Sequence, residues 1–140
     1  YFKDLSVENP NAPMSFQWQD APQLDVQMNV EAEQVEGEIH EVKLRIQLTS
    51  KHEAGTAFIV ELTYCGLIGM RGLPAEAEHA FTYAEAPRIL FPFARRIISD
   101  AVRDAGFPPV MLDPIDFNGL YAQQLAAAQQ TAEAEPAGNA

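Results

Sequence analysis

Hydrophobic and polar residues alternate along two long stretches in the first half of the chain, residues 24–32 and 39–49. One face of these stretches carries Leu24, Val26, Met28, Val30, Ala32, Val42, Leu44, Ile46 and Leu48, and polar residues lie between them. A period of two over this length indicates half-buried antiparallel strands. The connection Gln34–Glu38 contains Gly37 and is typical of a hairpin loop.

Two further stretches show the same period. In Thr56–Tyr64 the pattern places Phe58, Val60, Leu62 and Tyr64 inward and Ala57, Ile59, Glu61 and Thr63 outward. At the start of the chain, Leu5 and Val7 share one face, and Asp4, Ser6 and Glu8 share the other. Phe2 breaks this second alternation. Beyond Tyr64 the sequence is apolar on both faces, so we expect that end of the strand to be covered.

The second half of the chain predicts helices. Pro74 suits a helix start before 75–84, and Pro87 is expected to interrupt that helix. In 88–105 an apolar stripe has helical spacing, and Gly106 suits its end. The stripe consists of Leu90, Phe93, Ile97, Ala101 and Ala105, and Pro92 inside it predicts a kink.

The C-terminal part is expected to be extended first and helical afterwards. Three prolines in 107–115 require an extended segment, and Asp116 can cap a last helix whose stripe is Phe117, Leu120, Tyr121 and Leu125. Residues 126–140, rich in Ala, Gln and Glu, are expected to form an acidic flexible tail. The order of elements predicts an α+β fold, a four-stranded antiparallel sheet followed by two helices packed on one face.

The net charge of the chain limits the classes of partner that it is expected to bind. Among 140 residues, 20 Asp and Glu against 9 Lys and Arg give a net charge of -11. Nucleic acid and anionic lipid both require a basic surface, so neither is an expected partner. The single cysteine, Cys65, permits no internal disulfide, and no apolar run approaches the ~20 residues that span a bilayer. No secretory signal is visible at the start.

Catalytic and metal-binding patterns are not found. The histidines His40, His52 and His79 lack zinc-like spacing, and we interpret them as surface or structural residues. There is no nucleotide-binding loop and no nucleophile elbow. The strand acids lie on the polar face, where solvation disfavours acid–base work, so we expect neither an enzyme, nor a cofactor, nor a metal site. The large side chains on the proline-restrained segments either fill the core or line a groove.

The same residues resemble the SecB family of bacterial protein-export chaperones. The resemblance rests on three ordered stretches: the opening YFKDLSVENPNAP at residues 1–13, TAFIVEL at 56–62, and APRILFPFAR at 86–95 continuing to GFPPVMLDPIDF at 106–117. It covers residues 1–125, which we expect to be a chaperone domain. It implies a cytoplasmic homotetramer, a dimer of dimers, which holds secretory precursors unfolded without ATP and passes them to the SecA translocation ATPase.

The resemblance also implies two sets of site residues. The motor-binding positions are Asp4, Glu8, Ile59 and Glu61, and the strand period independently places all four on the polar face. The client groove corresponds to Met14, Phe16, Trp18, Phe107, Val110, Met111, Leu112, Phe117 and Tyr121. Neither nucleotide nor metal is expected to bind the chaperone, and no direct membrane insertion is expected.

Two other hypotheses remain open on the sequence. A SecB-like chaperone or adaptor could serve another client, such as a toxin–antitoxin pair, because fold similarity does not fix the partner. The other hypothesis, less favoured by the sequence, is a small ligand-binding or catalytic α+β domain.

Overall fold

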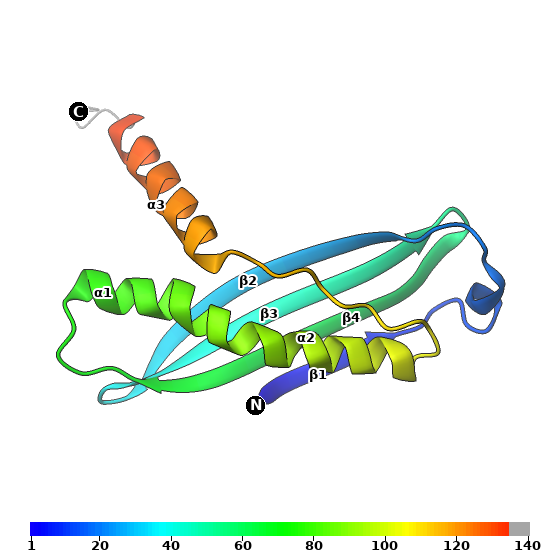
Figure 1. The fold of residues 1–140 in the computed structure, drawn as a ribbon, viewed down its shortest axis with the longest axis horizontal. Coiled ribbons are helices and arrows are strands. Elements are labelled where there is room, and N and C mark those ends of the chain that lie inside the picture. Colours follow the sequence, from blue (N-terminus) through cyan, green and yellow to red (C-terminus); the bar gives the residue numbers. More distant parts are fainter. Residues whose placement is uncertain (135–140) are drawn as a thin grey trace, which may run out of the picture.

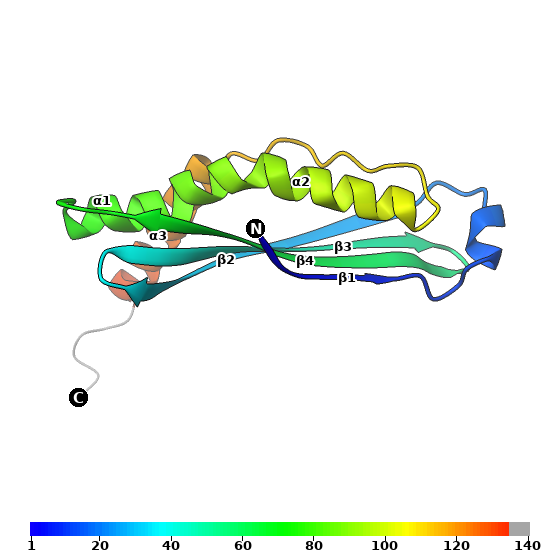
Figure 2. The same cartoon turned by 90° about the horizontal axis from the view of Figure 1, so that it is seen from below.

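A computed structural model describes residues 1–134 as one sheet with helices on one of its faces (Figure 1). Seen along the sheet, the helical layer lies on one side and the other side is bare (Figure 2). The elements in chain order are β1 (Phe2–Glu8), a 3₁₀ turn η1 (Met14–Gln17), β2 (Gln23–Glu36), β3 (Ile39–His52), β4 (Gly55–Gly69), α1 (Ala75–Ala80), a π-helical segment η2 (Phe81–Glu85), α2 (Ala86–Asp104) and α3 (Phe117–Ala134). The predicted four-stranded antiparallel sheet followed by helices is confirmed.

The strand order of the sheet is β1-β4-β3-β2, with every pair antiparallel. The inner face of the two central strands is the hydrophobic core, because alternate residues of β3 and β4 are almost completely buried. These residues are Leu44, Ile46, Leu48, Phe58, Val60 and Leu62. The predicted inward positions of these six residues are therefore confirmed. Ala57, predicted to face outward, is instead fully buried in the core, at the point where the β3–β4 register shifts between Ser50 and Lys51. On the edge strand β2 the inner face is less covered, since Leu24 and Val26 are about 40% exposed.

A β-bulge explains why Phe2 breaks the alternation of the first strand. The register of β1 against β4 shifts between Phe2 and Asp4, so that Phe2 lies opposite Tyr64 on the inner face. After the bulge, Leu5 is opposite Leu62 and Asp4 is opposite Thr63. One extra residue thus returns both Phe2 and Leu5 to the inner side.

The helical layer is one uninterrupted run from Ala75 to Asp104, and the predicted break at Pro87 is wrong. The helix instead widens to π-type turns at Phe81–Glu85, and α2 begins directly after them. Pro87 then lies in the first turn of α2. Pro87 has no N–H to donate to these wider turns, and its place in the first turn of α2 is one that a helix tolerates.

The face of α2 that packs on the sheet is one residue out of step with the predicted stripe. Phe91, Ala94, Ile98, Ala101 and Val102 are buried in the core, and of these only Ala101 belongs to the predicted set. Phe93 is 52% exposed, and Leu90 and Ile97 are half-buried at the edge of the core. The helix carries two adjacent apolar rows with the same spacing, so periodicity alone could not choose between them.

The end of α2 and the start of α3 follow the predicted signals. Gly106 has a φ of 99° and follows the last turn of α2, and residues 107–116 form no helix or strand. The Asp116 carboxylate accepts a hydrogen bond from the Gly119 N–H at 3.0 Å, which caps α3. Phe117 anchors this helix in the core through edge-on packing against Phe91, with ring centroids 5.7 Å apart.

Beyond its first turns, α3 projects away from the sheet (Figure 1). It packs against η2 rather than lying flat on the strands. The helix continues through residues 126–134, where we expected the flexible tail to begin. Ala and Gln are strong helix formers, and no Gly or Pro interrupts them before Pro136. Residues 135–140 of the expected tail lie outside the described residues.

The one-residue offset of α2 generates a stability prediction. Ile98→Ala should lower the free energy of unfolding by about 2–5 kcal/mol, because it empties a fully buried position. Ile97→Ala makes the same chemical change at a half-buried position and should cost at least about 1 kcal/mol less. Urea unfolding at one protein concentration measures both. An equal or larger loss from Ile97→Ala would contradict the observed packing.

Candidate functional site

The four predicted docking residues lie together on the bare face of the sheet. Glu8 on β1 is paired with Ile59 on β4, and two residues along the same strands Ser6 is paired with Glu61. Asp4 follows in the next outward position, opposite Thr63. Directly paired residues of an antiparallel sheet share a face, so Glu8 and Glu61 flank Ile59, and Asp4 lies farther along the same surface. We call Asp4, Glu8, Ile59 and Glu61 the acidic patch.

The acids of this patch differ from the other acids on the same sheet face. Among residues 1–134, the carboxylates of Asp4, Glu8 and Glu61 form no ion pair. Arg45 lies in the same row of the sheet as Asp4, since both are paired with Thr63, but its ion pair is with Glu31 at 3.3 Å. Lys43, in the next outward position of β3, pairs with Glu33 at 3.7 Å. These two bases are therefore engaged by Glu31 and Glu33 of β2, whereas Asp4, Glu8 and Glu61 keep no ion-pair partner among the described residues.

Glu41 departs from the expected solvation of the outer-face acids, since it is only 7% exposed. The Tyr1 hydroxyl donates a hydrogen bond to its carboxylate, and Lys3 Nζ lies 3.0 Å from Oε1. These two donors hold the pKa of Glu41 below its usual range, and the same hydrogen bond raises the pKa of Tyr1 to about 12. Burial raises the pKa of the neighbouring Cys65 thiol. Glu41 fastens β1 to the sheet and is not available for docking.

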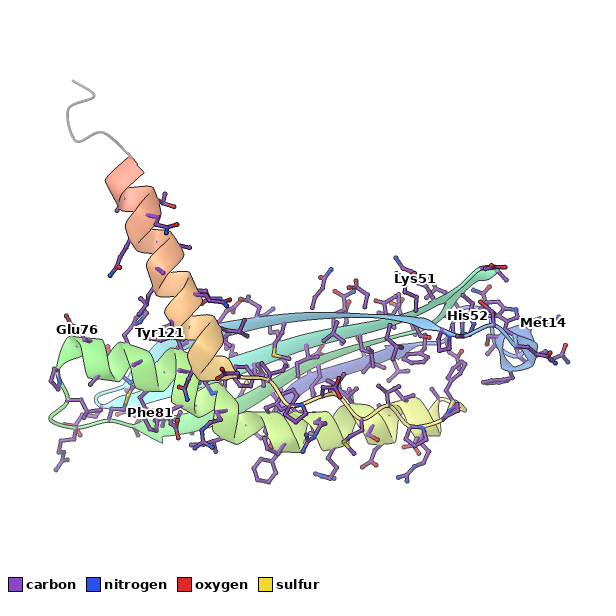
Figure 3. All side chains as sticks on the ribbon, turned by 45° about the horizontal axis from the view of Figure 1, so that its top comes forward. Met14, Lys51, His52, Glu76, Phe81 and Tyr121 are labelled. Carbon is purple, nitrogen blue, oxygen red and sulfur yellow. The ribbon has the colours of Figure 1, made fainter. Side chains whose placement is uncertain are left out.

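Aromatic side chains from three distant segments meet at the end of the sheet near the β3–β4 turn. Phe107 packs between Phe16 and Phe58 with tilted rings, whose centroids are 5.1 and 5.0 Å from its own. Together with Trp18 and Val110 they line a cavity of about 420 Å³, which we call the loop pocket. Figure 3 shows Met14 and His52 at this end of the molecule. Four predicted groove residues, Phe16, Trp18, Phe107 and Val110, are thus brought together.

Two glycines allow these aromatic rings to approach the backbone. A Cβ on Gly106 would lie 2.8 Å from the Phe16 ring, and Gly106 has a φ of 99° that other residues rarely adopt. A Cβ on Gly55 would lie 3.2 Å from the Asn11 side-chain amide and 3.7 Å from the Trp18 ring. The position of Phe16 in the loop pocket therefore depends on glycine at Gly106, whereas a Cβ on Gly55 would meet Trp18 at an ordinary contact distance.

Tyr121 belongs to a different surface, about α3 and α1 (Figure 3). Its hydroxyl lies 2.6 Å from His79 Nδ1, and the His79 ring packs on Tyr83 with centroids 4.7 Å apart. Cavities of about 370 and 520 Å³ share Tyr121, His79 and Leu125 in their walls, and we call them the helix cavities. Met28 and Val30 of β2 line the smaller cavity.

The remaining predicted groove residues are divided between surface and core. Met14 and Met111 are exposed, by 62% and 65%. Leu112 and Phe117 are buried in the core, although Phe117 also reaches the smaller helix cavity. The sequence did not identify His79 and Tyr83 as wall residues, because their role arises from the way α1 and η2 lie against α3. Leu120 and Leu125 were indicated by their place in the α3 stripe.

Within the described part of the chain, no group of three His, Cys, Asp or Glu residues is placed to hold a metal ion.

None of the helices in residues 1–134 combines the length and the apolar character needed to cross a bilayer.

Comparisons with known proteins identify the family. Residues 1–128 match the family described as "Preprotein translocase subunit SecB". The chain belongs to the SecB family. It is 68% identical over its full length to the "Protein-export protein SecB" of Novosphingobium aromaticivorans, covering 81% of that protein. It is 57% identical to the protein of that name in Erythrobacter litoralis, over 99% of this chain and 76% of the relative.

Another relative agrees, and a solved structure supports the fold. The Sphingopyxis alaskensis "Protein-export protein SecB" is 55% identical over the whole chain and 83% of its own length. A SecB-like chaperone of Mycobacterium tuberculosis, solved in complex with a ChAD peptide from an antitoxin, has a TM-score of 0.69. The similarity covers 82% of this chain and 86% of that one at 14% identity, which establishes the fold alone. The relatives make this a protein-export chaperone, and the toxin–antitoxin alternative is not favoured.

The close approach at Gly106 generates a prediction about the loop pocket. Gly106→Ala should lower the free energy of unfolding by about 1–2 kcal/mol through its backbone conformation alone. Displacement of Phe16 should add about 1 kcal/mol or more. In a Phe16→Ala background that second part disappears, so Gly106→Ala should cost less there. Thermal unfolding of the four proteins measures the difference, and equal costs in both backgrounds would contradict the close approach.

Proposed function

We propose that this chain holds unfolded secretory precursors in apolar grooves, without ATP, and delivers them to the SecA translocation ATPase. The observation that carries the proposal is the separation of two surfaces. The apolar cavities lie at the helical layer and the loop end, whereas the acidic patch lies on the bare sheet face. A protein that carries one partner and hands it to another needs two sites that can be occupied together.

The client site is proposed to comprise the loop pocket and the helix cavities. Their walls combine aromatic, aliphatic and methionine side chains, which adapt to many apolar sequences. A folded protein offers no extended apolar segment, so unfolded chains are selected without any reading of sequence. Met14 and Met111 are proposed to extend the client surface beyond the loop pocket, because both are large, apolar and exposed. Leu112 is buried and is proposed to support the groove from the core.

The motor site is proposed to be the acidic patch. Its three carboxylates have no ion-pair partner in the described residues, so a basic partner meets open negative charge there. Ile59 is half-buried beside Glu8 and Glu61 and offers an apolar contact within the patch. Charge complementarity of this kind affects mainly the rate and specificity of association.

Assembly and location are part of the same proposal. We propose a cytoplasmic homotetramer, a dimer of dimers, in which residues 1–125 form the chaperone domain and residues 126–140 an acidic extension. Four copies carry a charge of about −44, which keeps a particle with apolar grooves in solution. Several grooves on one particle raise the effective concentration for one long client, so weak contacts suffice.

Charge reversal and truncation should separate the two sites. Asp4→Lys combined with Glu61→Lys should weaken binding to purified SecA by tenfold or more, about 1.4 kcal/mol, and leave the affinity for a denatured precursor unchanged. Phe16→Ala combined with Tyr121→Ala should do the reverse, since each removes an aromatic wall. Equilibrium binding of both partners to each variant measures this.

Glu33→Lys is the matched control for the charge reversal, because Glu33 lies on the same sheet face, does not line the surface shared by Asp4 and Glu61, and already pairs with Lys43. It should affect SecA binding much less than the double reversal. Loss of both partners to the same extent in the charge-reversed protein would refute the separation of sites.

A further inference from the structure

One carboxylate ties the proline-rich loop before β2 to the β3–β4 turn. Asp20 Oδ1 lies 2.9 Å from His52 Nδ1, at the last residue of β3. Asp20 Oδ2 accepts a hydrogen bond from the Glu53 backbone N–H at 3.1 Å. The two oxygens therefore hold consecutive residues of the turn. His52 and the Glu53 N–H keep the pKa of Asp20 below its usual value, so the carboxylate is charged at neutral pH.

The His52 ring lies between this carboxylate and the only tryptophan of the chain. Its centroid is 5.2 Å from that of Trp18, and the two ring planes are tilted by 54°. The side chain of His52 is only 10% exposed. Trp18 also lies near Gly55, the strand partner of His52, where no side chain intervenes. Trp18 thus packs beside the His52 imidazole and the first residue of β4.

Trp18 differs from the other aromatic residues of the loop pocket in what supports its ring. Phe16, Phe58 and Phe107 support one another by direct ring contacts. Trp18 is only partly buried, and its neighbour His52 is oriented by the Asp20 carboxylate. Trp18, Asp20 and His52 all border the same cavity. When a wall side chain is already fixed in the free protein, ligand binding does not carry the free-energy cost of ordering it.

We propose that Asp20 and His52 are positioning residues for client binding, which hold Trp18 in place as a preformed wall of the loop pocket. The inference rests on the proposed function, since it assigns a role within the client site. Fixing one large side chain beforehand corresponds to a gain in affinity of about 2- to 10-fold. The polar pair need not touch the client; it acts through Trp18.

The test uses the emission of Trp18, which reports on this wall without any client. At pH 8, Asp20→Ala and His52→Ala should each shift the emission to the red and increase quenching by acrylamide. Both should weaken binding of a dye-labelled, carboxymethylated unfolded protein by about 2- to 10-fold in fluorescence anisotropy. The double variant should bind about as weakly as Asp20→Ala alone, because both changes break one unit.

Two variants separate positioning from charge and from general destabilisation. Glu53→Ala removes one acid from the same turn but keeps the backbone N–H that Asp20 accepts, so it should leave emission and affinity unchanged. Asp20→Asn keeps an oxygen acceptor in place, so this variant should retain most of the wild-type Trp18 emission and most of the affinity for the unfolded client. Should Asp20→Ala not fold, His52→Gln carries the test, because it can still reach Asp20 but lacks the ring against Trp18.

The outcomes distinguish this inference from the proposed function. If the wild-type protein does not bind the unfolded client, the proposed function is contradicted. If it binds, but Asp20→Ala leaves Trp18 emission unchanged or binds the client as tightly as wild type, the positioning role is wrong. A loss in Glu53→Ala equal to that in Asp20→Ala would equally overturn it, since charge alone would then explain the effect.

Discussion

The antiparallel pairing of β3 with β4 assigns each side chain of these strands to one of two faces, and both proposed binding surfaces depend on that assignment. The inner residues Leu44, Ile46, Val60 and Leu62 are buried beneath α2. A shift of one residue in the register would move this set to the solvent side and bring Ile59 and Glu61 into the core, so burial of one face fixes the other. The acidic patch is therefore a consequence of the hydrophobic core on the opposite side.

The strands could be predicted because half-buried strands expose their period directly in the sequence. The same period predicts Asp4, Glu8, Ile59 and Glu61 on one face, and the strand pairing agrees. The period does not predict the structure where a β-bulge or a π-helical segment changes the backbone. A bulge returns Phe2 to the inner face, and the π turns before Pro87 allow one continuous helix. Neither the bulge nor the π turns produce a repeating pattern of hydrophobic and polar residues from which they could be predicted.

Side-chain environments were harder to predict than elements. The helix α2 has two apolar rows, and the sequence does not say which row meets the sheet, so the buried role of Phe91 and Ile98 was missed. Glu41 shares the outer face with solvated acids but is covered by Tyr1 and Lys3. The loop pocket joins segments around residues 16, 58 and 107, and its polar tie at Asp20 and His52 arises from contacts between positions 32 residues apart. Contacts between residues so far apart in the chain produce no local sequence pattern from which they could be predicted.

The central claim is that this chain assembles into a tetramer that retains unfolded proteins without nucleotide. Size-exclusion chromatography with light scattering tests it most directly, using one secretory precursor in its unfolded form and the same protein folded. The account predicts the mass of four chains plus one precursor for the unfolded form in the absence of ATP, and the mass of four chains alone beside the folded form. A monomer, or equal retention of the folded and unfolded protein, would contradict it.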